Sequence, residues 1–136
     1  MHTLRHYWQI LALAAVVALL GAACSTAAQS APPGTGLAIT AVAGPTCPVE
    51  KIPPDPACAP RPVVGATVLV VDGGGNTIAT VLTDAKGTAS ASVPAGNYVV
   101  RPQPVVGLMG TAGDQTVTIV DGVLTPVVLA YDTGIR

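Results

Sequence analysis

The chain has 136 residues, of which half are hydrophobic and only 10% are charged, and its formal net charge is −1. This length suits one domain, and the near-neutral charge excludes the basic surface on which nucleic-acid binding depends. Histidine occurs only at His2 and His6, so a chain that loses its first residues lacks the commonest general base and cannot form a Ser-His-Asp triad.

The first 23 residues have the pattern of an export signal. Arg5 lies in a short polar start, and the uncharged run "ILALAAVVALLGAA" fills positions 10–23. This apolar run is shorter than the roughly 20 residues of a membrane-spanning helix and suits the central region of a signal peptide. We therefore predict that residues 1–23 are a signal peptide.

The end of this run, "LLGAAC", resembles the lipobox of bacterial lipoproteins, and the resemblance implies that Cys24 receives a diacylglyceryl group and becomes the new N-terminus. Residues 24–35 then form a lipidated end and a flexible tether, as their small and polar residues favour. Simple secretion after "GAA" and an uncleaved anchor are the alternatives. The predicted location is the cell envelope, facing outward from the cytoplasmic membrane, and Ser25 resembles an outer-membrane sorting signal in a cell that has two membranes.

The two remaining cysteines are Cys47 and Cys58. In an exported protein such a pair forms a disulfide by default. Two thiols supply only half of the ligands of a structural zinc site, and no histidine remains to complete it, so we predict no metal and no cofactor.

Residues 36–136 are predicted to be an all-β domain, because short strand patterns alternate with turn residues and no segment has a long helical period. The expected fold is a seven-stranded antiparallel β-sandwich with Greek-key connections. The seven predicted strands are 36–43, 66–71, 77–83, 88–93, 98–101, 115–120 and 124–131. The strand at 66–71 is apolar almost throughout and is expected in the centre of a sheet, whereas the small residues of 88–93 suit an edge or a thinly packed strand.

Most aspartates lie beside turn residues, where a carboxylate bonds nearby backbone amides. Five positions follow this pattern: Asp55, Asp72, Asp84, Asp114 and Asp121. We interpret them as turn-forming residues, so no catalytic residue is predicted. An enzyme that uses carboxylates alone would need two of them together with one raised pKa, and nothing in the sequence brings two together.

The segment 62–102 resembles the carboxypeptidase regulatory-like domain and the B-type repeats of collagen adhesins, which are prealbumin-like β-sandwiches. The matching residues are Gly65 at a strand start, "TD" with Gly87 at a turn, and the P-x-G-x-Y-x-V pattern at Pro94–Val100. The resemblance implies a prealbumin-like fold and is silent on function. Within this pattern Tyr98 is expected to bury its ring and to hydrogen-bond the backbone through its hydroxyl.

The loop 101–114 carries four candidate partner-binding residues, Val105, Val106, Leu108 and Met109. An apolar loop marks either a partner site or a segment that caps the core, and the sequence leaves both open. The predicted function is that of a non-catalytic, lipid-anchored binding, adhesion or structural module. Its expected partners are the membrane, through the lipid, and an envelope protein or wall component. A carrier of a small apolar ligand or peptide is the alternative.

Overall fold

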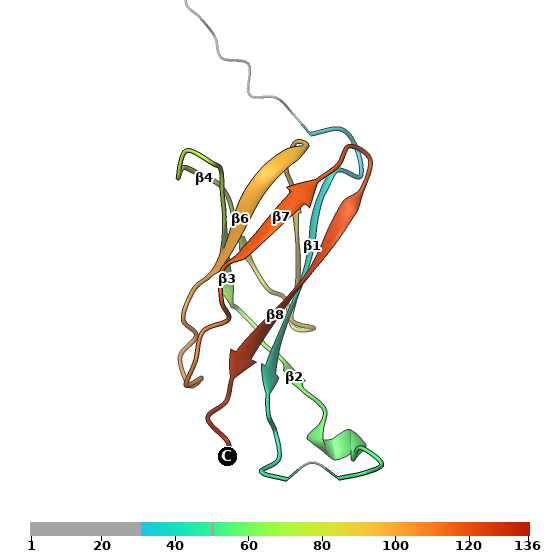
Figure 1. Ribbon diagram of the computed structural model, residues 1–136, viewed down its shortest axis with the longest axis vertical. Helices are drawn as coiled ribbons and strands as arrows, with labels where there is room; N and C mark the ends of the chain where they lie inside the picture. Colours follow the sequence, from blue (N-terminus) through green and yellow to red (C-terminus); the bar gives the residue numbers. More distant parts are fainter. Residues whose placement is uncertain (1–30, 50) are drawn as a thin grey trace, which may run out of the picture.

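A computed structural model describes residues 31–49 and 51–136. The described chain contains eight β-strands and one short 3-10 helix, and together they form a β-sandwich (Figure 1). The strands are β1 (Gly36–Gly44), β2 (Arg61–Pro62), β3 (Thr67–Val71), β4 (Thr77–Leu82), β5 (Thr88–Ser92), β6 (Gly96–Pro102), β7 (Gln115–Ile119) and β8 (Leu124–Asp132), and the helix η1 spans Pro56–Cys58. The predicted all-β sandwich is confirmed.

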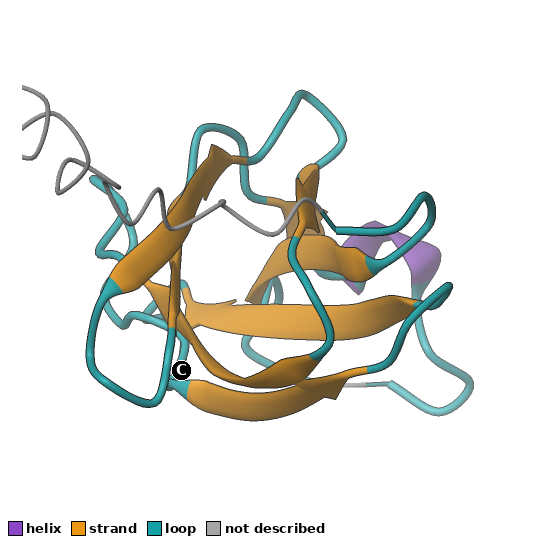
Figure 2. Cartoon of the chain, turned by 90° about the horizontal axis from the view of Figure 1, so that it is seen from above, coloured by secondary structure: helices purple, strands orange, loops and turns teal. Residues whose placement is uncertain are grey.

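The strands form two four-stranded sheets. In the first sheet β1 is central, with β8 on one side and β5 and β2 along the other, and in the second the order is β4-β3-β6-β7. The chain leaves the second sheet after β4 and returns to it at β6, which is the kind of crossing that a Greek-key fold makes. Seen from above, the strands enclose a common interior and the loops lie outside it (Figure 2).

One strand pairing differs from the antiparallel prediction. Strands β1 and β8 are parallel over their full length, with Gly36 opposite Leu124 and Gly44 opposite Asp132. Both strands start at the end of the sandwich where the N-terminal segment enters, and both run toward the opposite end (Figure 1). Because nearly the whole domain separates them in sequence, no hairpin turn forces them to be antiparallel.

Alternating side chains fill the space between the sheets. In β8 the residues Val127, Leu129 and Tyr131 are buried while their neighbours are exposed, and the period of two is the signature of a strand with one face in the core. The largest buried side chains of the other strands are Leu37, Ile39, Val68, Val70, Val100 and Ile119. The predicted central position of β3 and edge position of β5 are both confirmed.

The outer edge of β8 is protected against pairing with another chain. Gln115 donates a 2.7 Å side-chain hydrogen bond to the carbonyl of Val128, which shows that the backbone of Val128 faces away from β1. By strand alternation Pro126 faces the same way, and it has no amide to donate. A proline and a side-chain bond on one edge are the devices by which β-proteins avoid edge-to-edge association.

Candidate functional site

The residues of the apolar loop take two different positions. Val105 and Leu108 are half-buried and pack against the core, whereas Val106 is fully exposed and Met109 is 75% exposed. A turn closed by a 3.2 Å hydrogen bond from the amide of Leu108 to the carbonyl of Val105 produces this separation. At its tip Gly107 has φ +88°, a backbone conformation that favours glycine. Val105 and Leu108 therefore cap the core, whereas Val106 and Met109 are exposed.

Val105 and Leu108 also form one wall of a groove of about 440 Å³. Three segments that are distant in the sequence line it: the end of β1 with β2 and the residues after it, the apolar loop, and the C-terminal segment. The lining residues are Ala43, Thr46, Arg61, Pro62, Val63, Val64, Val105, Val106, Gly107, Leu108, Thr133 and Ile135. We call this hollow the distal groove, because the end of β1, β2 and the C-terminal segment, which line it, lie at the end of the sandwich opposite to residues 31–35 (Figure 1).

The groove has a buried apolar floor and an exposed apolar rim. Ala43 and Val63 are 6% and 5% exposed, so they are part of the core. Val64 and Val106 stand at the rim, with 58% and 102% of their surfaces exposed. Apolar side chains that remain exposed around a hollow are typical of a binding surface.

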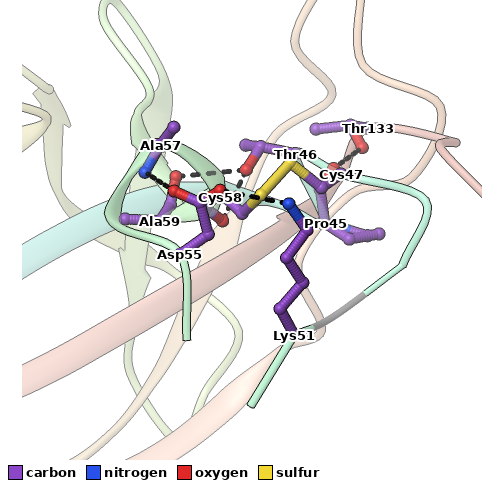
Figure 3. The surroundings of a disulfide bond; sticks show 9 residues. All are labelled: Pro45, Thr46, Cys47, Lys51, Asp55, Ala57, Cys58, Ala59 and Thr133. Atoms are coloured by element: carbon purple, nitrogen blue, oxygen red, sulfur yellow. Dashed lines mark hydrogen bonds and ion pairs between the residues drawn. A yellow bond between two sulfur atoms is a disulfide. The ribbon is translucent and has the colours of Figure 1, made fainter. Parts of the chain in front are cut away.

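A disulfide fixes one border of the groove. Cys47 and Cys58 are joined as predicted, with their Cα atoms 5.3 Å apart. Thr46, which lines the groove, donates a 2.5 Å hydrogen bond to the carbonyl of Cys58, and the threonine thus ties the end of β1 to the disulfide loop (Figure 3). Lys51 and Asp55 form an exposed ion pair of 3.8 Å within the same loop. Lys51 and Asp55 also line a second hollow of about 470 Å³, together with three prolines, Cys58 and Ala59.

The C-terminal segment forms the opposite border and is held through Asp132. The backbone of Asp132 accepts from the amide of Met109 at 2.9 Å and exchanges hydrogen bonds with Gly110, which attaches the end of β8 to the apolar loop. Its carboxylate accepts from Arg136 at 2.8 Å and from the amide of Gly134 at 2.8 Å. The hydrogen bond from Arg136 is the main cause that lowers the pKa of Asp132 to about 2, and the amide of Gly134 contributes.

Three other aspartates have the turn-forming role that the sequence predicts. Asp72 accepts from the amides of Gly74 and Asn76, and Asp84 accepts from those of Lys86 and Thr88. These backbone donors lower the pKa of both carboxyl groups. Asp55 is the N-cap of η1 and accepts from the amide of Ala57.

Asp114 and Tyr98 differ from expectation. Asp114 forms an exposed ion pair with Arg101 at 2.8 Å instead of a turn bond. The hydroxyl of Tyr98 has no hydrogen-bond partner among the described residues, and its half-buried ring lies against Gly96. Tyr131 takes the predicted role, because it is 2% exposed and donates a 3.2 Å hydrogen bond to the carbonyl of Gln103.

The described residues contain neither a cluster of metal ligands nor a membrane-spanning helix. Within 31–49 and 51–136, no three histidine, cysteine or acidic side chains gather closely enough to hold a metal ion. Across the same ranges, no helix has the length and hydrophobicity to cross a bilayer. Cys24 and the predicted signal peptide lie outside the described residues.

Comparisons with known proteins show the fold of the domain but no family. Neither a scan of protein-family models nor a search of curated proteins finds a match. Among solved structures, 73% of the chain superposes on part of the Bacillus anthracis TIE protein with a TM-score of 0.54 and 19% identity. The same share superposes on a minor pilin of Streptococcus agalactiae with a TM-score of 0.53 and 19% identity.

These matches cover 16% of the TIE protein chain and 44% of the pilin chain, so the described domain corresponds to a minor part of each. At such low identity the likeness shows a shared β-sandwich fold. It assigns no ligand and no assembly to this chain.

Proposed function

We propose that this protein is a non-catalytic recognition module of the cell envelope, held to the membrane by diacylated Cys24, which contacts an envelope protein or a wall component through the distal groove. The observation that carries the proposal is that the start and the groove of the sandwich lie at opposite ends. Residues 31–35 lie at one end of the domain, and β2, the disulfide loop and the C-terminal segment lie at the other (Figure 1). Residues of β2 and of the C-terminal segment line the groove.

This placement at opposite ends suits a protein that is anchored at its N-terminus and binds a partner through the groove. The nine residues of β1 span the domain from Gly36 to Gly44, which is about 27 Å at the usual rise per residue. A lipid at Cys24 would hold the entry end near the membrane and leave the groove on the far side. The likeness to a minor pilin supports an adhesion or structural role in the envelope.

The composition of the site supports recognition over catalysis. The lining of the groove contains no carboxylate and no histidine, and Arg61 is its single charged residue. General acid or base chemistry needs a titratable group within reach of a bound substrate. The groove supplies apolar contact, amide donors and one fixed positive charge, which together suit binding.

Site-specific photo-crosslinking in intact cells tests the proposal. A photoreactive amino acid at position 106, on the groove rim, is compared with the same amino acid at position 120, in the turn between β7 and β8 at the opposite end. Val106 and Val120 are both exposed valines, with 102% and 57% of their surfaces accessible. We expect a discrete crosslinked product from position 106 only.

Equal crosslinking from both positions, or from position 120 alone, would show that the groove is not the contact surface.

The lipid anchor is tested separately. Cys24→Ser should release the protein from the membrane fraction or leave an unprocessed precursor, and a wild-type protein with a free thiol at Cys24 would refute lipidation.

The alternative of a small-ligand carrier is supported by one observation. The volume of the groove, about 440 Å³, lies within the range of small-molecule sites. A carrier should release an apolar compound when the purified protein is extracted with organic solvent and analysed by mass spectrometry, and a recognition module should not.

A further inference from the structure

The distal groove is lined by residues with free hydrogen-bond donors. Arg61 is exposed and takes part in none of the ion pairs or side-chain hydrogen bonds between described residues. The amides of Val64, Val106 and Gly107 likewise have no acceptor within 31–49 and 51–136. The two threonine hydroxyls of the lining are already used, because Thr46 donates to Cys58 and Thr133 donates to Pro45.

A ligand that completes this surface must therefore bring acceptors together with apolar area. The floor and rim of the groove are valine, leucine, isoleucine and alanine side chains, which favour a branched apolar group. A guanidinium favours a carboxylate, with which it forms charge-assisted and often bidentate hydrogen bonds. No acidic residue lines the groove to compete for Arg61 or to repel an anion.

We propose that the distal groove binds an extended peptide segment in which a branched apolar residue adjoins a carboxylate, the carboxylate pairing with Arg61. This inference rests on the proposed function and names the ligand class of its site. The donors favour a peptide over a fatty acid, because they belong to two separate walls, 61–64 and 105–108. A peptide offers a carbonyl at every residue, whereas a fatty acid has acceptors at one end only.

Titration with matched peptides tests the proposal on the detergent-solubilised full-length protein. The probe is the fluorescently labelled hexapeptide Gly-Ser-Leu-Asp-Gly-Ser with an amidated C-terminus, and binding is followed by fluorescence anisotropy. Two control peptides replace aspartate with asparagine or leucine with serine. We expect the asparagine peptide to bind about five- to tenfold more weakly than the probe, and the serine peptide to bind at least as weakly as that.

Charge variants of the protein assign the effect to Arg61. Arg61→Gln should remove the difference between the aspartate and asparagine peptides, and Arg61→Lys should restore part of it. Lys86→Gln removes an exposed positive charge that lies outside the groove and should leave the difference intact. Because Arg61 is exposed, we expect its variants to melt at the wild-type temperature.

Three outcomes would overturn the proposal. These are equal binding of the aspartate and asparagine peptides, loss of the difference with Lys86→Gln, and Arg61-dependent binding of decanoate without binding of any peptide. A crosslinked product at position 106 with no peptide affinity would leave the groove as the contact site and refute only the ligand class. No crosslinked product together with Arg61-dependent peptide binding would refute the cellular role and not the chemistry.

Discussion

The hydroxyl of Tyr131 donates a 3.2 Å hydrogen bond to the carbonyl of Gln103, and so joins the last strand to the segment that leads from β6 into the apolar loop. Tyr131→Phe removes this bond and leaves the carbonyl without its partner. We expect the free energy of unfolding to fall by about 1 kcal/mol, measured by urea denaturation. An unchanged midpoint would show that water replaces the hydroxyl at no cost.

Because Tyr131 is buried, we expect the protein to lose stability at high pH. Burial raises the pKa of Tyr131 above its ordinary value of 10.0, because removal from water costs the charged phenolate more free energy than it costs the neutral phenol. The contribution of Tyr131 to the free energy of unfolding is therefore complete below pH 10, and it is lost as the pH rises through the higher pKa of the folded state. The melting temperature should fall between pH 10 and 12 in the wild type and fall less in Tyr131→Phe.

The apolar loop offers a matched pair of double substitutions. Val105→Ser with Leu108→Ser replaces half-buried side chains that pack against the core and should lower the free energy of unfolding by about 2–4 kcal/mol. Val106→Ser with Met109→Ser replaces exposed side chains and should change it by less than about 0.5 kcal/mol. Equal destabilisation by the two pairs would contradict the division of the loop into side chains that cap the core and side chains that are exposed.

Gly87 is predicted to be irreplaceable for steric reasons. Its φ is +73°, and a Cβ there would lie 2.5 Å from the carbonyl oxygen of Ala41 and 3.0 Å from Pro62. Gly87→Ala should destabilise the domain by several kcal/mol, because it adds a backbone clash to the strain of a left-handed residue. Gly65 is the control. It has a similar φ of +69° and no atom within 4 Å, so Gly65→Ala should cost only about 1–2 kcal/mol.

Reduction of the disulfide should weaken the fold without abolishing it. Cys47 and Cys58 close a loop with a sequence separation of 11, for which the chain-entropy model gives about 2.8 kcal/mol. The prolines of the loop already stiffen the unfolded chain, so the measured loss should be somewhat smaller. Calorimetry with and without reductant measures it. Complete unfolding on reduction would contradict a disulfide loop that lies outside the main sheets.

Much of this fold follows from local pattern. Alternation of apolar and small polar residues in 36–44 and 115–119 is visible in the sequence, and the strands lie within a few residues of the predicted ranges. The disulfide was predictable because the predicted export and lipidation of Cys24 leave only Cys47 and Cys58 to pair with each other. Strand β2 was not predictable, since two residues carry no period and their pairing depends on the end of β1.

The groove could not be predicted, because its walls come from three segments that only the folded chain brings together. The sequence indicates the apolar loop, but it does not show which of its side chains turn inward. That outcome depends on the turn at Gly107. Arg61 carries no signal in the sequence, since an exposed arginine beside a proline is usually a solvated residue, and its placement in the groove depends on the pairing of β2 with β1.

The central claim is that partner recognition requires the distal groove. The most direct test is partner capture by formaldehyde crosslinking in intact cells, quantified by mass spectrometry, for two double variants of the full-length protein. Val64→Ser with Val106→Ser changes the groove rim. Val120→Ser with Val123→Ser makes the same two substitutions at exposed positions at the opposite end of the sandwich. We expect the first variant to lose the partner and the second to retain it, with both present at wild-type abundance. Full capture by the rim variant, or loss of capture by the control alone, would contradict this account.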